Sequence, residues 1–511
     1  MATKNSTIAK NTIFLSLRMI FVLFISLYTS RVFLNVLGIV DYGISNVVTG
    51  FVSMFGFLNT SLANGIQRFY NSELGHNTEN GVKKVYNTSL VIQAMIAFVV
   101  AVMLESLGLW YMFNKMVIPE DRFWTAFWIY QCAAISSVVV IMQSPYSAAI
   151  MAYERMNVYA IFSIFDVLFK LVFALALPYI AIDRLLMYGV FYLVASLIGF
   201  LLNYFYCKCE LGELKLGRYI DKGMFKSMLS FSGWNMFGTF ACMVREQGLN
   251  LVLNLFFGPV INAARGIAYQ VTGALQGFVS NISLAAKPQM VQSYATGDSA
   301  RTMTLMYAMS KLSYLILFVL SLPIILNIDY ILRLWLGNTV PDKASIFVVL
   351  VVLTNFMNNL NAPLSNVVYA TGKMRNYELV FSLVNLSIIP ISFFVLDYGA
   401  PAESAFVTYF IMSILVQICC LFVLKTIVNI SIRSYFLKLI LPLLLTSVIS
   451  CTLLIAVHSL LPHNLIGIFV EYVFVFLETT LFFYFICLNN TEKKNITLIP
   501  QHFDLTLFIS S

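Results

Sequence analysis

Charged side chains interrupt several apolar runs that are long enough to cross a membrane. Arg18 lies in the first run with no acidic residue near it, and Arg245 and Glu246 are neighbours in a later run. A charge at the bilayer centre costs roughly 2.5 to 3.5 kcal/mol on insertion scales, so it must face a partner, water or the interior of a helix bundle. We predict that Arg18 contacts an anion; the alternative is that it snorkels to the membrane surface. Adjacent residues do not share a helix face, so we expect at least one of Arg245 and Glu246 to face a cleft.

Another run carries an acidic and a basic residue, Asp166 and Lys170, four positions apart. Residues at i and i+4 are neighbours on a helix surface, so the two side chains are predicted to meet. The pair is either a binding site for a coupling H⁺ or Na⁺ or a purely structural salt bridge. The same two alternatives hold for Glu246 beside Arg245.

Polar residues recur at helical spacing on three runs. The first set is Tyr42, Asn46, Thr49, Ser53 and Thr60; the second is Arg265, Tyr269, Thr272, Gln276 and Ser283; the third is Asn235, Thr239, Glu246 and Asn250. Such spacing puts each set on one face of a helix. We predict that these polar stripes line a cleft; the alternative is that they form hydrogen bonds between helices without any cavity.

Two of these stripes belong to an internal repeat. GISNVVTG at Gly43–Gly50 returns as GIAYQVTG at Gly266–Gly273, and PYSAAIMAYERMNVY at Pro145–Tyr159 returns as PLSNVVYATGKMRNY at Pro363–Tyr377. An even number of predicted spans separates matching positions, which indicates parallel repeats related by an axis along the membrane normal. We therefore predict two six-helix lobes that enclose a cleft, with Gly50 and Gly273 allowing close helix approach.

The composition identifies an integral membrane protein. Of the 511 residues, 60% are hydrophobic and 11% are charged, whereas soluble domains are about 25% charged. The apolar runs do not alternate as barrel strands do, so they predict an all-α protein with about fourteen transmembrane helices. The predicted parts are an N-terminal lobe (1–206), a cytoplasmic linker (207–226), a C-terminal lobe (227–424), and two extra spans with a cytoplasmic tail (425–511).

The charge distribution predicts the orientation. If the N-terminus lies in the cytoplasm, most of the 31 Lys and Arg fall in cytoplasmic loops, as the positive-inside rule requires. Both termini are then cytoplasmic. Basic loops beside anionic headgroups account for the net charge of +8, so no nucleic-acid partner is expected.

The sequence offers no catalytic or cofactor motif. It contains no G-x-x-x-x-G-K-[ST] phosphate loop, which excludes an ATP motor on this chain. The eight cysteines have no zinc-type spacing, and the four histidines, which form no cluster in the sequence, are predicted to be solvated. The external loops are too short for a catalytic domain. We therefore expect no cofactor, no metal and no catalytic residues, and we predict transport by alternating access.

Four segments carry a resemblance to a known family: YTSRVFLNVLGIVDYGISNVV, FGFLNTSLANGIQRFYNSELG, MQSPYSAAIMAYERMNVYAIFSIFDVLFKL and GPVINAARGIAYQVTGAL. They resemble the multidrug/oligosaccharidyl-lipid/polysaccharide (MOP) exporter superfamily in its polysaccharide or O-antigen flippase branch. The resemblance implies that the protein moves an oligosaccharide linked to undecaprenyl diphosphate across the bacterial inner membrane. It also implies that arginines in the cleft attract the diphosphate and acidic sugars, a role that falls here to Arg18, Arg31, Arg245 and Arg265.

Two other functions are alternatives to this one. A drug or cation antiporter of the same superfamily favours acidic residues in the cleft, and Asp166 and Glu246 keep that alternative open. A membrane-embedded polysaccharide polymerase or ligase needs a large external loop, which is not predicted here. The expected partners are a lipid-linked oligosaccharide, membrane lipids, a coupling H⁺ or Na⁺ and polysaccharide-assembly proteins. Whether the last two spans border a groove for the lipid tail is left open.

Overall fold

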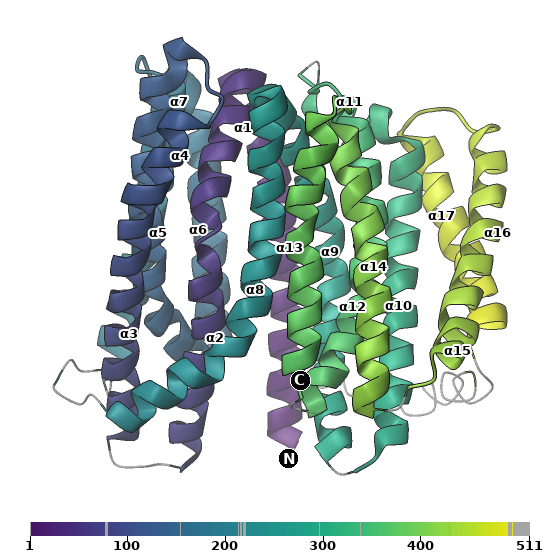
Figure 1. Ribbon diagram of the computed structural model, residues 1–511, viewed down its shortest axis with the longest axis horizontal. Helices are drawn as coiled ribbons and strands as arrows, with labels where there is room; N and C mark the ends of the chain where they lie inside the picture. The colour runs from purple at the N-terminus through teal and green to yellow at the C-terminus, as the bar shows by residue number, and fades with distance from the viewer. Residues whose placement is uncertain are drawn as a thin grey trace. The chain divides into compact units, whose positions relative to one another are not determined.

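The structure is a computed structural model that describes residues 2–76, 80–153, 155–212, 214, 217, 221–295, 297–337, 339–371, 373–428, 430–488 and 493. The regular structure of these residues is helical throughout, which confirms the predicted all-α class (Figure 1). The helices are α1 (Ala2–Ser53), α2 (Gly56–His76), α3 (Gly81–Met103), α4 (Leu109–Asn114), α5 (Phe123–Ala152), α6 (Met156–Ala176), α7 (Arg184–Glu210), α8 (Lys222–Phe257), α9 (Pro259–Ala295), α10 (Ser299–Leu326), α11 (Ile328–Leu336), α12 (Ala344–Thr371), α13 (Arg375–Asp397), α14 (Glu403–Val428), α15 (Ile432–Tyr435), α16 (Leu441–His458) and α17 (Leu465–Phe482).

Among the described residues, 11 helical stretches are long and apolar enough to cross a membrane. Large apolar side chains on them point outward, including Phe98, Trp124 and Phe205, as expected of surfaces that contact lipid. The protein is therefore a multi-span membrane protein. The count of fourteen is not confirmed: the 11 stretches include neither α8 nor α9, which carry polar stripes, and they take Phe21–Ser53 as one stretch.

A glycine with positive φ lies shortly before each copy of the repeated octet, where one helical segment ends and the next begins. Gly38, with φ 80° and ψ 170°, divides α1 into two helical segments. Gly258, with φ 72°, lies between α8 and α9. This backbone conformation strains residues that have a Cβ, which is why glycine occupies both positions.

The contacts of the chain fall into two compact units. Unit 1 comprises residues 1–271, 332–351 and 378–416, and unit 2 comprises residues 272–331, 352–377 and 417–511. Within unit 1, α5 packs along α7, and α8 packs against α1 and α2. Within unit 2, α10 packs against α16 and α17. The predicted lobes, 1–206 and 227–424, are a different division of the chain and stay a prediction.

An ion-pair network holds the segment that follows Gly38. The Arg122 guanidinium binds both carboxylate oxygens of Asp41, and its Nη1 lies 2.6 Å from Asp183 Oδ2. The other carboxylate oxygen of Asp183 caps α7 by accepting from the amides of Leu185 and Leu186. One guanidinium therefore ties the second segment of α1 to the start of α5 and the start of α7. The sequence analysis did not identify these three charges, which lie far apart in the chain.

The glycines of the repeated octets serve different purposes. A Cβ on Gly50 would lie 2.6 Å from Asn250 Nδ2 and 2.7 Å from Gln247 Oε1, so the predicted close approach is confirmed there. The prediction is wrong for Gly273, where a Cβ would meet no atom of the described residues within 4 Å. The tightest approach is at Gly43, where a Cβ would lie 1.9 Å from the main-chain oxygen of Pro259. Glycine at this position lets α1 touch the backbone at the start of α9.

The predicted linker, 207–226, is partly helical. Residues 207–210 extend α7 and residues 222–226 begin α8. Between them, Gly217 N donates to Asn87 Oδ1 and Asp221 N donates to Thr88 Oγ1, so this part of the segment is fastened to α3. Exposed basic side chains stand at nearby helix ends, for example Lys208 and Lys222.

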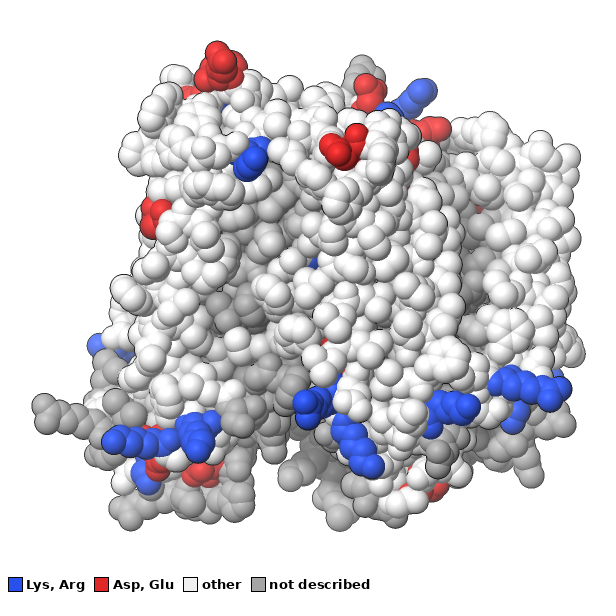
Figure 2. Space-filling view, in the orientation of Figure 1, with Lys and Arg blue, Asp and Glu red and all other residues white. Residues whose placement is uncertain are grey.

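Charged side chains are rare over the middle of the helices (Figure 2). On the visible face, most Lys, Arg, Asp and Glu side chains lie near an end of the helices. This distribution agrees with helices whose middle sections lie in lipid. The orientation with cytoplasmic termini stays a prediction.

Candidate functional site

Arg245 of α8 is buried inside unit 1, with 5% of its surface exposed. Its Nη1 donates to Asn385 Oδ1 of α13 at 2.5 Å, and its Nη2 lies 3.1 Å from Glu246 Oε1. The guanidinium also lies over the ring of Tyr409, 4.8 Å from its centroid. Glu246 is therefore a charge partner of Arg245, which is one of the two alternatives for this residue, because the long arginine side chain folds back to its neighbour.

Arg265 of α9 reaches the same place on α8. It is 6% exposed, and its Nη2 donates to the main-chain oxygen of Glu246 at 2.5 Å. Its guanidinium stacks over the Tyr269 ring at 4.1 Å from the centroid. The Nε atoms of Arg245 and Arg265 are both buried and have no hydrogen-bond partner among the described residues. We call Arg245, Glu246, Arg265 and Tyr269 the arginine cluster.

The other two predicted arginines have different positions. Arg31 donates through Nη1 to the main-chain oxygen of Leu334 at 3.3 Å, in an exposed contact. The side chain of Arg18 lies outside the described residues. Of the four predicted anion-binding arginines, the structure thus brings Arg245 and Arg265 together around Glu246.

Three buried asparagines, Asn250, Asn254 and Asn262, lie between Glu246 and Arg265 in the sequence. Asn250 Nδ2 donates to the main-chain oxygen of Asn46, and Asn262 Nδ2 donates to Asn250 Oδ1 at 2.7 Å. Asn254 Nδ2 in turn donates to Asn262 Oδ1 at 3.1 Å. These amides join α1, α8 and α9 through hydrogen bonds. Asn254 and Asn262 were missed by the sequence analysis, although the four-residue spacing of Asn250 and Asn254 is a helical-face signal.

The remaining stripe residues also make contacts within the protein. Thr49 Oγ1 donates to the main-chain oxygen of Ser45, one turn earlier. In unit 2, Gln276 and Asn359 exchange two hydrogen bonds of 3.0 Å each, and Thr272 is buried. The side chain of Asn235 is outside the described residues. For Asn250 and Gln276, these contacts match the alternative of hydrogen bonds between helices, whereas the Asn46 and Thr49 side chains bond within their own helix.

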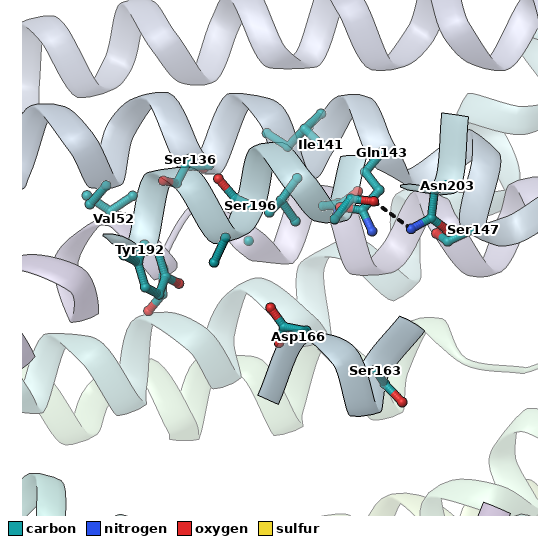
Figure 3. Close-up of a pocket in the computed structure, with 18 of the residues that line it drawn as sticks. Val52, Ser136, Ile141, Gln143, Ser147, Ser163, Asp166, Tyr192, Ser196 and Asn203 are labelled. Carbon is teal, nitrogen blue, oxygen red and sulfur yellow. Dashed lines mark hydrogen bonds between the residues drawn. The ribbon is translucent and has the colours of Figure 1, made fainter. Parts of the chain in front are cut away.

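A cavity of about 540 Å³ lies inside unit 1, mainly between α5, α6 and α7. Most of its polar lining is made of hydroxyl and amide groups: Asn59, Ser136, Ser137, Gln143, Ser147, Ser163, Ser196 and Asn203. Figure 3 shows Asp166 projecting from its helix towards the space beside Ser196 and Ser136. Pockets of roughly 300 to 1,000 Å³ are typical of small-molecule sites.

The predicted charge pair lines this cavity. Lys170 Nζ lies 2.7 Å from Asp166 Oδ2, which confirms the contact expected from the four-residue spacing. Lys170 also lies over the Tyr192 ring at 5.9 Å. Both charged side chains keep more than a third of their surface exposed. The pair therefore adds a carboxylate and an ammonium group to a lining that is otherwise suited to a hydroxylated ligand.

The two sites differ in what they can bind. The arginine cluster offers guanidinium groups, which make charge-assisted bonds to phosphate oxygens. The cavity offers neutral hydrogen-bonding groups and one ion pair. Among the described residues, no group of three or more His, Cys, Asp or Glu is placed to hold a metal ion.

Solved structures with the same fold are transporters. The chain matches "Lipid II flippase MurJ, inward closed conformation" with a TM-score of 0.66 and 12% identity, over 96% of this chain and 99% of that chain. It matches an inward-facing multidrug resistance MATE family transporter of the MOP superfamily with a TM-score of 0.64 and 12% identity, over 80% and 96%. A MOP superfamily transporter from Pyrococcus furiosus gives a TM-score of 0.63 and 11% identity, over 82% and 96%. The chain thus has the MOP transporter fold.

Sequence comparison assigns the family. No curated protein matches the chain. The family model described as "Polysaccharide biosynthesis protein" matches residues 8–294, which is more than half of the chain and includes the arginine cluster and all residues that line the cavity. The chain is therefore a member of the polysaccharide biosynthesis protein family.

Proposed function

We propose that this protein is a flippase that moves an oligosaccharide linked to a polyprenyl diphosphate across the bacterial inner membrane by alternating access. Membership of the polysaccharide biosynthesis family and the MOP fold support a lipid-linked sugar as the cargo. The observation that carries the proposal is the pairing of Arg245 and Arg265 around Glu246 in the interior of unit 1. The cytoplasmic location of both termini belongs to the same proposal.

The arginine cluster has the chemistry that a diphosphate requires. Each guanidinium has five N–H donors, and the two Nε–H groups are buried without a partner among the described residues. A buried donor without a partner costs about 1 to 3 kcal/mol. A diphosphate that reaches the cluster can accept from these donors and replace Glu246 as the partner of Arg245. We propose Arg18 and Arg31 as further contacts for the diphosphate or for acidic sugars during transport.

The cavity of unit 1 supports the sugar part of this proposal. Its serine, asparagine and glutamine side chains are both donors and acceptors, which matches the hydroxyl groups of a glycan. Its volume of about 540 Å³ is that of a site for a few sugar rings at most. A longer oligosaccharide would occupy it only in part.

The test uses cells in which this chain is the sole flippase for its glycan. Arg245→Gln and Arg265→Gln are each expected to reduce surface glycan about tenfold or more, since a hydrogen bond to a charged group contributes about 1.5 to 3 kcal/mol. Lipid-linked oligosaccharide should accumulate on the cytoplasmic leaflet. It is measured by its accessibility to a glycosidase in inside-out compared with right-side-out vesicles.

The matched control is Arg184→Gln, because Arg184 is an exposed arginine of the same unit that donates a long bond of 3.4 Å to the main-chain oxygen of Val36. It should leave glycan export unchanged. Normal export by both cluster variants, at the wild-type protein level, would contradict the proposed role of the arginine cluster.

A second candidate function is export of an organic cation, as in MATE transporters. It is favoured by the carboxylate of Asp166, which lines the cavity. This carboxylate is paired with Lys170 but is not buried, so a cationic ligand can reach it. If this function is correct, the wild-type protein lowers the accumulation of a cationic dye in cells, and Asp166→Asn abolishes that effect. Equal dye accumulation with and without the protein would exclude this candidate and leave the flippase proposal intact.

A further inference from the structure

A histidine and a glutamate meet between α16 and α17, which lie outside residues 8–294 that the family model matches. Glu471 of α17 is 2% exposed, and its Oε1 lies 2.7 Å from Nδ1 of His458, the last residue of α16. Its other oxygen, Oε2, accepts from Asn327 Nδ2 at 2.6 Å. Asn327 is the residue that ends α10. The expectation that His458 is a solvated residue is therefore wrong.

Glu471 is the buried member of the pair, and His458 is the partly exposed member. Glu471 belongs to the inward face of α17, with Ile468 and Val475. The His458 side chain keeps 21% of its surface exposed, and its ring lies 4.8 Å from the ring of His463, an exposed residue of the short α16–α17 loop. Nδ1 of His458 faces Glu471, which leaves Nε2 as the ring nitrogen that can exchange a proton with water.

Several other titratable groups of unit 2 lie on α10, α11 and α17, the elements around this pair. On α17, Tyr472 donates to the main-chain oxygen of Leu320, and Glu478 lies two turns further along beside Cys451 of α16. On α10, Tyr314 bonds to Ser447 of α16 at 2.9 Å, and Lys311 is buried with a contact of its own. Asp329, two residues after Asn327, is exposed at the start of α11.

We propose that His458 and Glu471 form a proton-binding site that controls how firmly the α16–α17 pair packs on α10. Without the extra proton, the neutral imidazole donates its Nδ1–H to the Glu471 carboxylate, and the site carries one buried negative charge. A proton from water then binds Nε2, which gives an imidazolium beside the same carboxylate. No bond other than the N–H bond forms, and the net charge of the site becomes zero.

The consequence follows from the cost of an uncompensated charge in a membrane protein. An isolated carboxylate in the apolar interior is unfavourable, whereas a hydrogen-bonded ion pair of zero net charge is tolerated. Protonation should therefore favour the packed arrangement, in which Asn327 of α10 holds Glu471. Loss of the proton should favour opening of the α16–α17 pair. This inference does not depend on the identity of the cargo.

The test measures backbone hydrogen exchange of the full chain in detergent, by mass spectrometry, at about pH 8 and about pH 5, the range in which histidine changes charge. After correction for the intrinsic effect of pH, peptides of α16 and α17 from the wild-type protein should exchange about tenfold more slowly at the lower pH. Glu471→Gln and His458→Gln should both lose this difference. His463→Gln, which removes an exposed ring but leaves the pair, should keep it.

Two outcomes would overturn the proposal. One is equal corrected protection of α17 in the wild-type protein at the two pH values. The other is a pH response that persists in His458→Gln, which removes the partly exposed partner and is expected to fold even if Glu471→Gln does not. Neither outcome bears on export of the glycan, so failure of this inference is distinguishable from failure of the proposed function.

Discussion

Replacing Gly43 by alanine is expected to lower the free energy of unfolding by about 3 kcal/mol, at the upper end of the cost of overpacking, or to prevent folding. The added Cβ would lie 1.9 Å from the main-chain oxygen of Pro259 and 2.6 Å from its carbonyl carbon. Main-chain atoms cannot rotate away as a side chain can, so α1 and the start of α9 would have to separate. The measurement is thermal unfolding of the purified protein in detergent, together with its yield.

The second copy of the octet provides a control, because its last residue, Gly273, is also a glycine inside a helix. A Cβ there meets nothing within 4 Å in the part of the chain that the structure describes, and alanine is favoured over glycine inside a helix by about 0.5 to 1 kcal/mol. Gly273→Ala should therefore unfold at the wild-type temperature or slightly above it. A Gly43→Ala protein as stable as Gly273→Ala would show that the close contact between α1 and Pro259 does not exist.

Removing the Arg122 guanidinium is expected to have the second large effect on stability. Arg122→Ala leaves the Asp41 carboxylate, whose side chain is 7% exposed, without its bidentate partner. Breaking a buried pair by removing one partner costs about 3 to 5 kcal/mol. Since Arg122 itself is 30% exposed and water reaches it, we expect the lower end, about 3 kcal/mol. The measurement is the unfolding temperature in detergent.

Two further variants test whether the loss of stability comes from the ion-pair network or from the loss of any charged side chain. Asp41→Asn combined with Arg122→Ala removes the buried negative charge and should recover part of the lost stability. Lys343→Ala breaks the more exposed pair with Glu403, at 2.8 Å, and should cost no more than about 1 kcal/mol. If Arg122→Ala and Lys343→Ala unfold at the same temperature, the network does not anchor the segment after Gly38.

The features that could be predicted from the sequence are those that depend on neighbours along one helix. Apolar runs of sufficient length determine a membrane-spanning helical protein, because the backbone must satisfy its hydrogen bonds within each span. The four-residue spacing of Asp166 and Lys170 determines their contact, since helix geometry alone brings them together.

The features that only the tertiary structure decided depend on which helix faces lie against one another. Periodicity puts Arg245 and Arg265 on helix faces, but the packing of α8, α9 and α13 brings both to Glu246 and adds Asn385. The same holds for Asp41 with Arg122 and for His458 with Glu471, which pair across separate helices. The two copies of the octet even differ: Gly50 lies against side chains of α8, whereas no described residue lies within 4 Å of a Cβ built on Gly273. Local spacing determines the face that a residue occupies, and the partner of that face is set by the packing of all the helices together.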